Sequence, residues 1–243
     1  MKYTRLLVVT VLAMLAGLAF GSCDEDNNTN GNGNEQPTPQ PESDWVDLGL
    51  PSGLLWAKCN LGASSPEEYG DYYAWGEVAT KEVYDAQTYS YYTMEDDGVT
   101  IATLSKYNVN GRYGIVDSLT VLQPEDDAAT VALGSGARIP THEEWEELCQ
   151  NCTRESVSQN GVKGNRFTGT NGNSIFLPCQ GKYNGSSLLN QNEEGDYWCS
   201  TMYMFAREYQ MGYAMIFNET DGYNLSRFSR KGGLNVRPVK KKK

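Results

Sequence analysis

Cysteine carries the most reactive side chain in this sequence, and the spacing of the cysteines limits the chemistry open to the chain. Cys149 and Cys152 have the C-x-x-C spacing of redox motifs. They fall, however, at the C-terminal end of a predicted helix, where the helix dipole raises the pKa of a thiol. No second pair repeats this spacing and His142 is the only histidine, so the sequence predicts no metal site built on cysteine and histidine.

Disulfide formation is the other chemistry open to the cysteines. Besides Cys23, which precedes the predicted folded region, the chain has Cys59, Cys149, Cys152, Cys179 and Cys199. In an oxidising compartment these can form two disulfides and leave one free thiol. Several pairings are compatible with the sequence, and among them we favour Cys59–Cys152 and Cys179–Cys199.

Other catalytic signals are missing from the sequence. It contains no G-x-S-x-G, no H-E-x-x-H and no glycine-rich phosphate loop. His142 falls in the first turn of a predicted helix, where a surface position is favoured. The chain has 31 acidic residues, so no carboxylate pair stands out as a catalytic dyad. We expect no catalytic residues and no enzymatic activity.

Aromatic residues give a more specific signal, which points to binding. Tyr69, Tyr72, Tyr73 and Trp75 cluster in a glycine-punctuated segment, interleaved with Glu67, Glu68, Asp71 and Glu77. Aromatic faces beside carboxylates suit sugar rings and also suit protein contacts. The alternative is that Trp75 and Tyr72 pack inside the loop as core residues.

Two later segments, 181–197 and 201–212, combine turn residues with further aromatic side chains. Tyr183, Tyr203 and Tyr209 are the candidates for ligand contact there, because long loops on a rigid sheet often carry recognition. A second small core beneath these loops is the alternative.

The N-terminal segment predicts export. Lys2 and Arg5 precede an apolar run from Leu6 to Phe20, which is shorter than the ~20 residues of a membrane span and fits a secretory signal. Residues 24–44 contain no large apolar residue, so we expect a disordered tether. The folded domain is then expected over residues 45–239, followed by a solvated basic tail at 240–243.

The junction between these segments resembles a bacterial lipobox. Phe20-Gly21-Ser22-Cys23 places a cysteine where lipidation occurs, and the acidic residues 24–26 resemble the surface-export signal of Bacteroidota-type lipoproteins. The resemblance implies a signal peptide over 1–22, a lipid anchor on Cys23 and an outer-membrane protein that faces the cell exterior. Several acyl chains on one residue would anchor it stably, at about 0.8 kcal/mol per buried methylene group.

The charge balance limits the partners. The formal net charge is −11, and loss of residues 1–22, which hold Lys2 and Arg5 and no acidic residue, makes it −13. So acidic a chain is not expected to bind nucleic acid or an anionic membrane surface.

The elements that would position these residues can be predicted from local patterns. Residues 45–50 and 54–61 form an expected hairpin around Pro51-Ser52-Gly53. Helices are expected over 124–133 and from His142 onward, the second with Thr141 and Glu144 as a capping box and Trp145, Leu148, Cys149 and Cys152 as its buried stripe. Strand signals cover 162–168, 174–177, 197–202, 213–218, 223–229 and 234–239. The 213–218 strand is apolar on both faces, which predicts a central position, and the whole pattern predicts an α+β fold.

Several blocks of the sequence resemble the Fibrobacter succinogenes major paralogous domain family. They are residues 46–77, PEDDAA (124–129), RIPTHEEWEEL (138–148), NGNSIFLP (171–178), GDYWCST (195–201) and LNVRPV (234–239). The family resembles the C-type-lectin-like fold of formylglycine-generating enzymes, so the resemblance implies a small twisted antiparallel sheet, two helices and long loops. Cys179 and Cys199 depart from the family pattern. The resemblance thereby implies a disulfide between them that is specific to this chain.

Function follows from the resemblance only in outline. Copper-binding relatives use two closely spaced thiolates near the C-terminus, whereas Cys179 and Cys199 are 20 residues apart and no cysteine follows. The sequence leaves open the alternative of a structural calcium ion held by loop oxygens. Asp117-Ser118-Leu119 resembles an O-glycosylation sequon at Ser118. We expect a non-enzymatic binding or adhesion module for a glycan or a protein. The alternatives are an accessory lipoprotein without a small-molecule ligand and a redox enzyme of the formylglycine-generating type.

Overall fold

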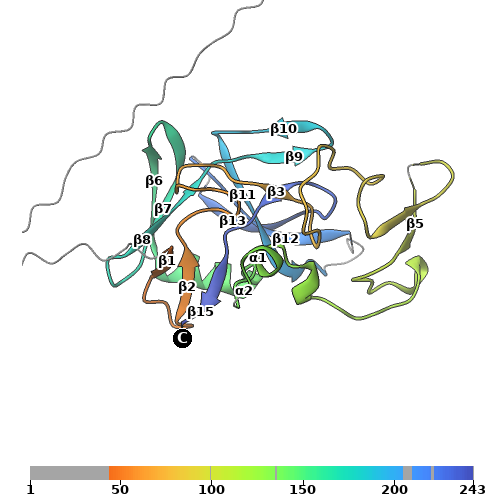
Figure 1. Cartoon of the computed structure of the whole chain (residues 1–243), viewed down its shortest axis with the longest axis horizontal. Helices are drawn as coiled ribbons and strands as arrows, with labels where there is room; N and C mark the ends of the chain where they lie inside the picture. The colour runs from red at the N-terminus through yellow and green to blue at the C-terminus, as the bar shows by residue number, and fades with distance from the viewer. Residues whose placement is uncertain (1–43, 99, 135, 205–209, 220–221, 243) are drawn as a thin grey trace, which may run out of the picture. The chain divides into compact units, whose positions relative to one another are not determined.

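Short strands joined by turns and longer loops build the fold in the computed structural model, which describes residues 44–98, 100–134, 136–204, 210–219 and 222–242. The predicted N-terminal hairpin is confirmed: β1 (Trp45–Asp47) pairs antiparallel with β2 (Leu54–Ala57). Gly53 has a φ of +66°, a conformation that favours glycine in this turn. The last strand, β15 (Val239–Lys241), pairs with the other edge of β2, so both ends of the described region meet in one three-stranded sheet (Figure 1).

A five-stranded sheet forms the centre of the fold, in the order β13-β12-β11-β14-β3. Its strands are β3 (Tyr72–Tyr73), β11 (Glu194–Met202), β12 (Met211–Asn218), β13 (Tyr223–Ser229) and β14 (Leu234–Asn235). The pairing is antiparallel except between β11 and β14.

Strand β12 lies between β13 and β11 and is apolar on both faces, as its sequence predicts. Met215 and Phe217 belong to one core cluster together with Trp145 of the second helix. Ala214 lies in the other cluster, which also contains Trp75 and Ala128. The sheet is therefore buried on both sides, by different parts of the chain.

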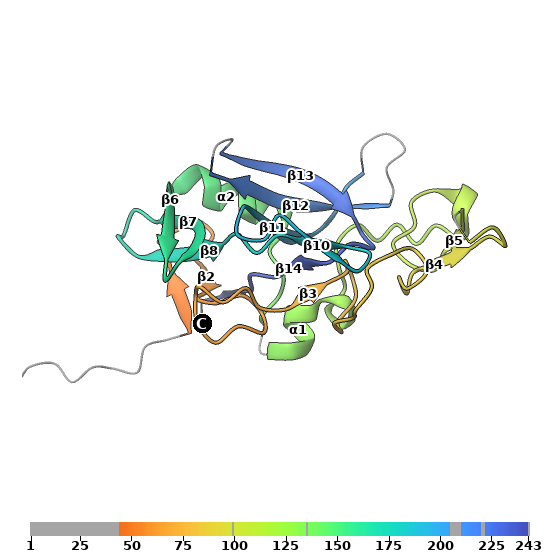
Figure 2. The ribbon, with the colours of Figure 1, turned by 90° about the horizontal axis from the view of Figure 1, so that it is seen from above.

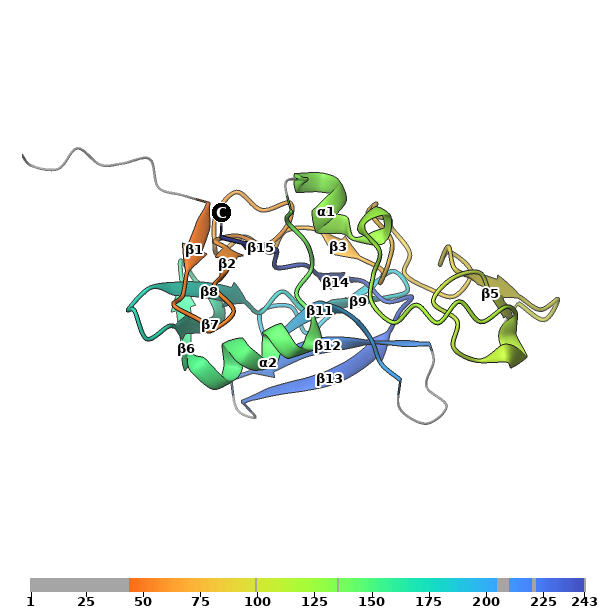
Figure 3. The same cartoon turned by 90° about the horizontal axis from the view of Figure 1, so that it is seen from below.

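The second predicted helix is confirmed as α2 (His142–Asn151). The Thr141 side chain accepts a hydrogen bond from the Glu144 backbone, and the Glu144 carboxylate accepts one from the Thr141 backbone, which completes the capping box. Trp145 and Leu148 are fully buried, while Cys149 and Cys152 are half-buried. The helix packs across β11, β12 and β13 (Figure 3).

The first predicted helix is shorter than expected. Residues 124–133 divide into a 3-10 turn, η2 (Pro124–Asp126), and a helix, α1 (Ala128–Leu133). Asp127 separates them because its carboxylate accepts hydrogen bonds from the backbone N–H groups of Thr130 and Ile139. An aspartate that caps a helix in this way cannot continue one, so the acidic residues precede α1 instead of forming its first turn.

A third sheet, in the order β6-β7-β8, packs beside the hairpin. Strands β7 (Val162–Thr168) and β8 (Ser174–Pro178) match their predictions, but β6 (Thr153–Gln159) was not predicted. Val157 is its only large apolar residue, so the alternation that marks a half-buried strand is too weak to recognise.

The predicted strand over 234–239 is wrong as a single element. It divides into β14 and β15, which belong to different sheets, and Arg237 and Pro238 make the crossing between them. Residues 115–122 are irregular apart from an isolated bridge at Val121.

The remaining elements are small and lie in the loops. They are β4 (Tyr92–Met94) with β5 (Ile101–Leu104), the 3-10 turn η1 (Gly111–Tyr113), and β9 (Lys182–Asn184) with β10 (Ser187–Leu189). The β4–β5 hairpin projects to one side of the central sheet (Figure 2). Small sheets with two short helices make the architecture α+β, as predicted.

Candidate functional site

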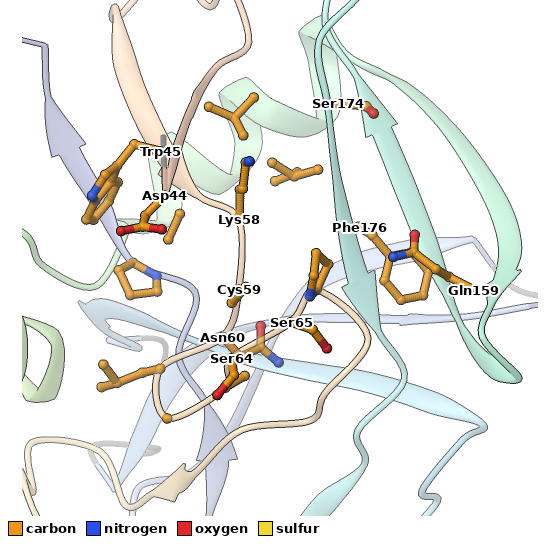
Figure 4. Close-up of a pocket in the computed structure, with 18 of the residues that line it drawn as sticks. Asp44, Trp45, Lys58, Cys59, Asn60, Ser64, Ser65, Gln159, Ser174 and Phe176 are labelled. Carbon is orange, nitrogen blue, oxygen red and sulfur yellow. The ribbon is translucent and has the colours of Figure 1, made fainter. Parts of the chain in front are cut away.

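One cavity is a groove of about 730 Å³ between the hairpin sheet and β8. Trp45 of β1 lies on one side and Phe176 of β8 on the other, with Lys58, Cys59 and Asn60 between them (Figure 4). The Nζ of Lys240 lies 4.2 Å from the centroid of the Trp45 ring. The groove combines apolar walls with a polar rim, which suits a ligand with both kinds of surface.

Arg237 lies fully buried beside this groove and fixes its floor. Its guanidinium donates hydrogen bonds to the carbonyls of Ala57 and Lys58, at 3.0 and 2.7 Å, and to the side-chain oxygen of Asn60. Burial lowers the pKa of Arg237, but an arginine stays protonated at neutral pH. Arg237 therefore has a structural role, because each hydrogen bond described above joins it to another group of the protein.

A second cavity, of about 350 Å³, lies between β3, the 80–84 segment and the β9–β10 hairpin. We call it the tyrosine pocket. Three tyrosines, two acids, one lysine and small polar residues line it: Gly70, Asp71, Tyr72, Thr80, Lys81, Glu82, Tyr84, Tyr183 and Ser186. Tyr72 and Tyr183, two of the residues predicted to contact a ligand, therefore share one site.

The three tyrosine rings of this pocket pack against one another. The rings of Tyr84 and Tyr183 are stacked with centroids 5.3 Å apart, and Tyr72 meets Tyr183 edge-on at 4.9 Å. The Tyr72 hydroxyl donates to the Gln180 carbonyl at 2.5 Å, and the Tyr84 hydroxyl donates to the Tyr72 carbonyl at 2.6 Å. Burial raises the pKa of both hydroxyls, so they stay neutral donors. Tyr84 is almost fully buried, while Tyr72 and Tyr183 are half-exposed.

Two buried asparagines position the loop that carries the pocket's acidic rim. Asn235 donates to the carbonyls of Tyr69 and Asp71, and Asn60 donates to the same Tyr69 carbonyl at 2.8 Å. Gly70 has a φ of +74°, and a Cβ atom there would lie 2.5 Å from the Leu61 carbonyl. The loop is thus held in one conformation at the point where Asp71 and Tyr72 enter the pocket.

The other aromatic residues of the predicted cluster do not line this cavity. Trp75 is fully buried, donates from Nε1 to the Cys199 carbonyl at 2.9 Å and has the Arg230 guanidinium 4.8 Å from its ring. Tyr73 is 7% exposed, and Tyr69 is half-buried outside the pocket. Trp75 and Tyr73 therefore pack as core residues and do not belong to the site. The alternative expectation, that Trp75 and Tyr72 are core residues, is confirmed for Trp75 and wrong for Tyr72, which is half-buried and lines the pocket.

Tyr203 lies in a different cluster, on the α2 side of the central sheet. Its ring meets Tyr213 at 4.9 Å, the Arg227 guanidinium lies 5.2 Å from it, and His142 approaches Tyr213 at 4.1 Å. Tyr209, the last aromatic candidate, is outside the described residues.

The five cysteines from Cys59 onward are free thiols, so the expected pairs Cys59–Cys152 and Cys179–Cys199 are not formed in the structure. Cys59 lines the groove, whereas Cys152 ends α2. Cys179 and Cys199 are both packed in the first core cluster, and Cys149 lies with its sulfur 3.9 Å from that of Met215. Burial raises the pKa of all five thiols, which makes them poor nucleophiles at neutral pH.

A buried carboxylate lies beneath the tyrosine pocket. Asp196 has no exposed side-chain surface, and its Oδ1 lies 3.0 Å from the Nζ of Lys182. Burial raises the pKa of Asp196 to about 6. Gln180 connects this pair to the pocket, because its side chain donates to the Asp196 carbonyl and its own carbonyl accepts from Tyr72.

Tyr84, Lys81 and Glu82 are site residues that the sequence does not indicate, because they fall in a polar, tyrosine-rich stretch without predicted elements. The available signal is Tyr84 itself, which follows the aromatic cluster by nine residues. Asp71 is one of the acidic residues interleaved with that cluster. No local pattern indicates that these residues return to meet Tyr183.

The remaining predicted positions are placed as follows. Ser118 is exposed in an irregular segment, with a φ of +59°, which leaves it accessible to modification. Cys23 is outside the described residues. No helix in the described part of the chain is long and apolar enough to cross a membrane.

Among the residues that the structure describes, no three His, Cys, Asp or Glu side chains are grouped so as to hold a metal ion. Comparison of the chain with protein-family models, with curated proteins and with solved structures finds no match.

Proposed function

We propose that the protein is a non-enzymatic carbohydrate-binding module carried on a surface lipoprotein. One observation carries this proposal: Tyr72 and Tyr183, from opposite halves of the chain, line a single cavity together with Asp71 and Glu82. Aromatic rings beside carboxylates are the combination from which the sequence predicts sugar binding.

The chemistry of the tyrosine pocket suits a saccharide. A sugar presents an apolar C–H face that packs on an aromatic ring, and its hydroxyls hydrogen-bond to carboxylates and to the hydroxyls of Thr80 and Ser186. The cavity volume of about 350 Å³ falls within the ~300–1,000 Å³ of small-ligand sites. Tyr72 and Tyr84 are held by hydrogen bonds to backbone carbonyls, so these two side chains lose little freedom on binding.

The fold and the cellular location of the protein are part of the same proposal. Antiparallel sheets with two helices and long loops are consistent with a C-type-lectin-like domain, the fold that the sequence resemblance implies. The apolar run at residues 6–20, Cys23 and the polar segment 24–44 support a lipid-anchored outer-membrane protein that faces outward. Replacement of Cys23 by alanine should release the protein from the membrane fraction, and retention there would refute the anchor.

A thiol-dependent redox enzyme has less support than a binding module. Each of the five described thiols has a raised pKa because it is buried, so little reactive thiolate is present near neutral pH. Turnover of a thiol substrate by the purified protein would revive the enzyme alternative.

A glycan array with the purified protein tests the proposed function. We expect bound saccharides to be lost in Tyr183→Ala and weakened in Tyr72→Phe, which keeps the ring and removes the hydroxyl. Tyr203→Ala is the matched control because Tyr203 lies in another cluster, and it should bind like the wild type. Unfolding curves of each variant separate lost binding from lost structure. An array without any bound glycan would favour an accessory lipoprotein or a protein ligand instead.

A further inference from the structure

We infer that the tyrosine pocket selects saccharides that carry a free amino group, in preference to neutral or acidic ones. The inference rests on the proposed carbohydrate-binding function and specifies its ligand class.

Two of the residues that line the pocket are acidic. Asp71 and Glu82 are both exposed, and neither forms an ion pair with any of the described residues. Asp71 accepts a long hydrogen bond, 3.4 Å, from the Tyr73 hydroxyl, and its carboxylate lies against Gly62. An amine bound in this cavity would be attracted by both negative charges, and a neutral sugar would not.

The lysine that lines the pocket does not cancel these charges, because its own charge is already compensated. The Nζ of Lys81 lies 2.6 Å from the Glu77 carboxylate, and the two side chains are only 18% and 9% exposed. The same nitrogen donates to the Thr88 carbonyl at 3.1 Å. Glu77 is fixed in turn by the Ser90 backbone and hydroxyl, at 2.7 and 2.8 Å. The Lys81–Glu77 pair is therefore neutral overall and leaves the pocket with a surplus of negative charge.

The aromatic walls favour a cation in the same place. Aromatic faces attract ammonium groups, and cavities that combine such faces with carboxylates recognise them well. Lys81 shows the preference within this protein, because its Nζ lies 5.6 Å from the Tyr84 ring and 5.7 Å from the Tyr89 ring. A ligand amine beside Tyr72 and Tyr183 would repeat this arrangement at the open side of the pocket.

Acidic saccharides should bind poorly because of two electrostatic effects, one within the pocket and one at longer range. Close to the site, a ligand carboxylate would meet Asp71 and Glu82 without a free cation among the lining residues. Over longer range, the formal charge of −11 repels anions and attracts cations. Charge thus selects among ligands that all share the sugar-ring contact with the tyrosines.

Calorimetric titration with matched tetrasaccharides tests the inference. The probes are a β-1,4-linked glucosamine tetramer, its fully N-acetylated counterpart and the neutral glucose tetramer, with a tetralysine peptide as a non-sugar amine. We expect the amino tetramer to bind at least about tenfold more tightly than the other two sugars and than tetralysine. Its affinity should fall as the pH is raised above the pKa of the sugar amine and as salt is added.

Charge-neutral variants identify the groups responsible. Glu82→Gln and Asp71→Asn should each weaken binding of the amino tetramer about fivefold, as expected for one exposed charge contact. They should leave the neutral tetramer unchanged. Glu143→Gln and Asp96→Asn remove exposed carboxylates outside the pocket and are the matched controls. Glu82 has no ion-pair partner among the described residues, so its replacement should not disturb folding.

The possible failures are distinguishable. Equal binding of all three sugars, lost in Tyr183→Ala, would keep the proposed function and overturn the amine selectivity. No binding of any sugar would overturn both. Tighter binding of tetralysine than of the amino tetramer would show a site for basic peptides and would also overturn the inference.

Discussion

Arg237 and Phe176 are joined by a hydrogen bond of 2.9 Å from the guanidinium Nη2 to the backbone carbonyl. Phe176 belongs to β8, whereas the other acceptors of Arg237 are the last residue of β2, Ala57, and two residues that follow it, Lys58 and Asn60. A single buried side chain therefore ties the hairpin sheet to the β6-β7-β8 sheet. The hydrogen bonds that Arg237 donates to the Ala57 and Lys58 carbonyls close the floor of the groove.

Replacement of Arg237 by methionine should strongly destabilise the protein. The change leaves three buried carbonyls and the Asn60 side-chain oxygen short of a donor, and such losses cost about 3–5 kcal/mol in total. Urea unfolding measures the effect. Arg112→Met, at an exposed position, is the control and should change the free energy of unfolding by less than about 0.5 kcal/mol. A small effect at Arg237 would contradict its role as the link between the sheets.

Asp196 should make the stability depend on pH between about 4 and 6. Its pKa in the folded protein is about 6, above the ordinary value of 3.8, because it is buried. The folded state therefore holds this proton more tightly than the unfolded chain does. The stabilisation is complete below about pH 4 and is lost as the pH rises through about 6, with a size of about 2–3 kcal/mol.

Comparison of the wild type with Asp196→Asn isolates this effect, because other titrating groups cancel in the difference. The free energy of unfolding of the wild type should fall relative to the variant as the pH is raised from about 4 to about 7. Urea titrations at several pH values give the difference. If it stayed constant over this range, Asp196 would titrate at its ordinary pKa.

Loss of the capping box should weaken α2 measurably. Thr141→Ala removes the acceptor for the Glu144 backbone N–H, which costs about 1 kcal/mol. Thermal unfolding followed by circular dichroism should show a lower Tm. Thr170→Ala, in an exposed turn, provides the comparison and is expected to leave the Tm unchanged.

The thiols should be reduced and unequally protected. Alkylation of the native protein without reductant should modify Cys59 slowly, and Cys179 and Cys199 hardly at all, because these two are buried in the core. In denaturant all five described cysteines should react. Peptide mass spectrometry reads out both results, and disulfide-linked peptides in the non-reduced sample would contradict the free thiols.

The parts of the fold that were predictable have strong local signals. The capping box gives the start of α2, the Pro51-Ser52-Gly53 turn gives the hairpin, and turn residues bracket β7 and β13 at their observed bounds. Strand β6 lacks such a signal because its pairing with β7, and not its own pattern, makes it a strand. The division of 234–239 depends on which sheet each half joins, which no local pattern contains.

The site was predictable by residue type but not by arrangement. Tyr72 and Trp75 looked alike in the sequence, yet one lines a cavity and the other is fully buried. Burial depends on tertiary packing, here on the approach of Arg230 and β11 to Trp75. Tyr84 joins the site through a backbone pairing with Gly185, a contact across more than a hundred residues that composition cannot indicate.

The pairing of β15 with β2 also constrains when this protein can fold. The hairpin sheet and the groove floor are incomplete without β15 and Arg237, which come late in the described domain. The domain therefore cannot reach its native state until β15 has left the ribosome, since β15 must pair with β2. Until that point the chain stays open enough to be threaded through a channel.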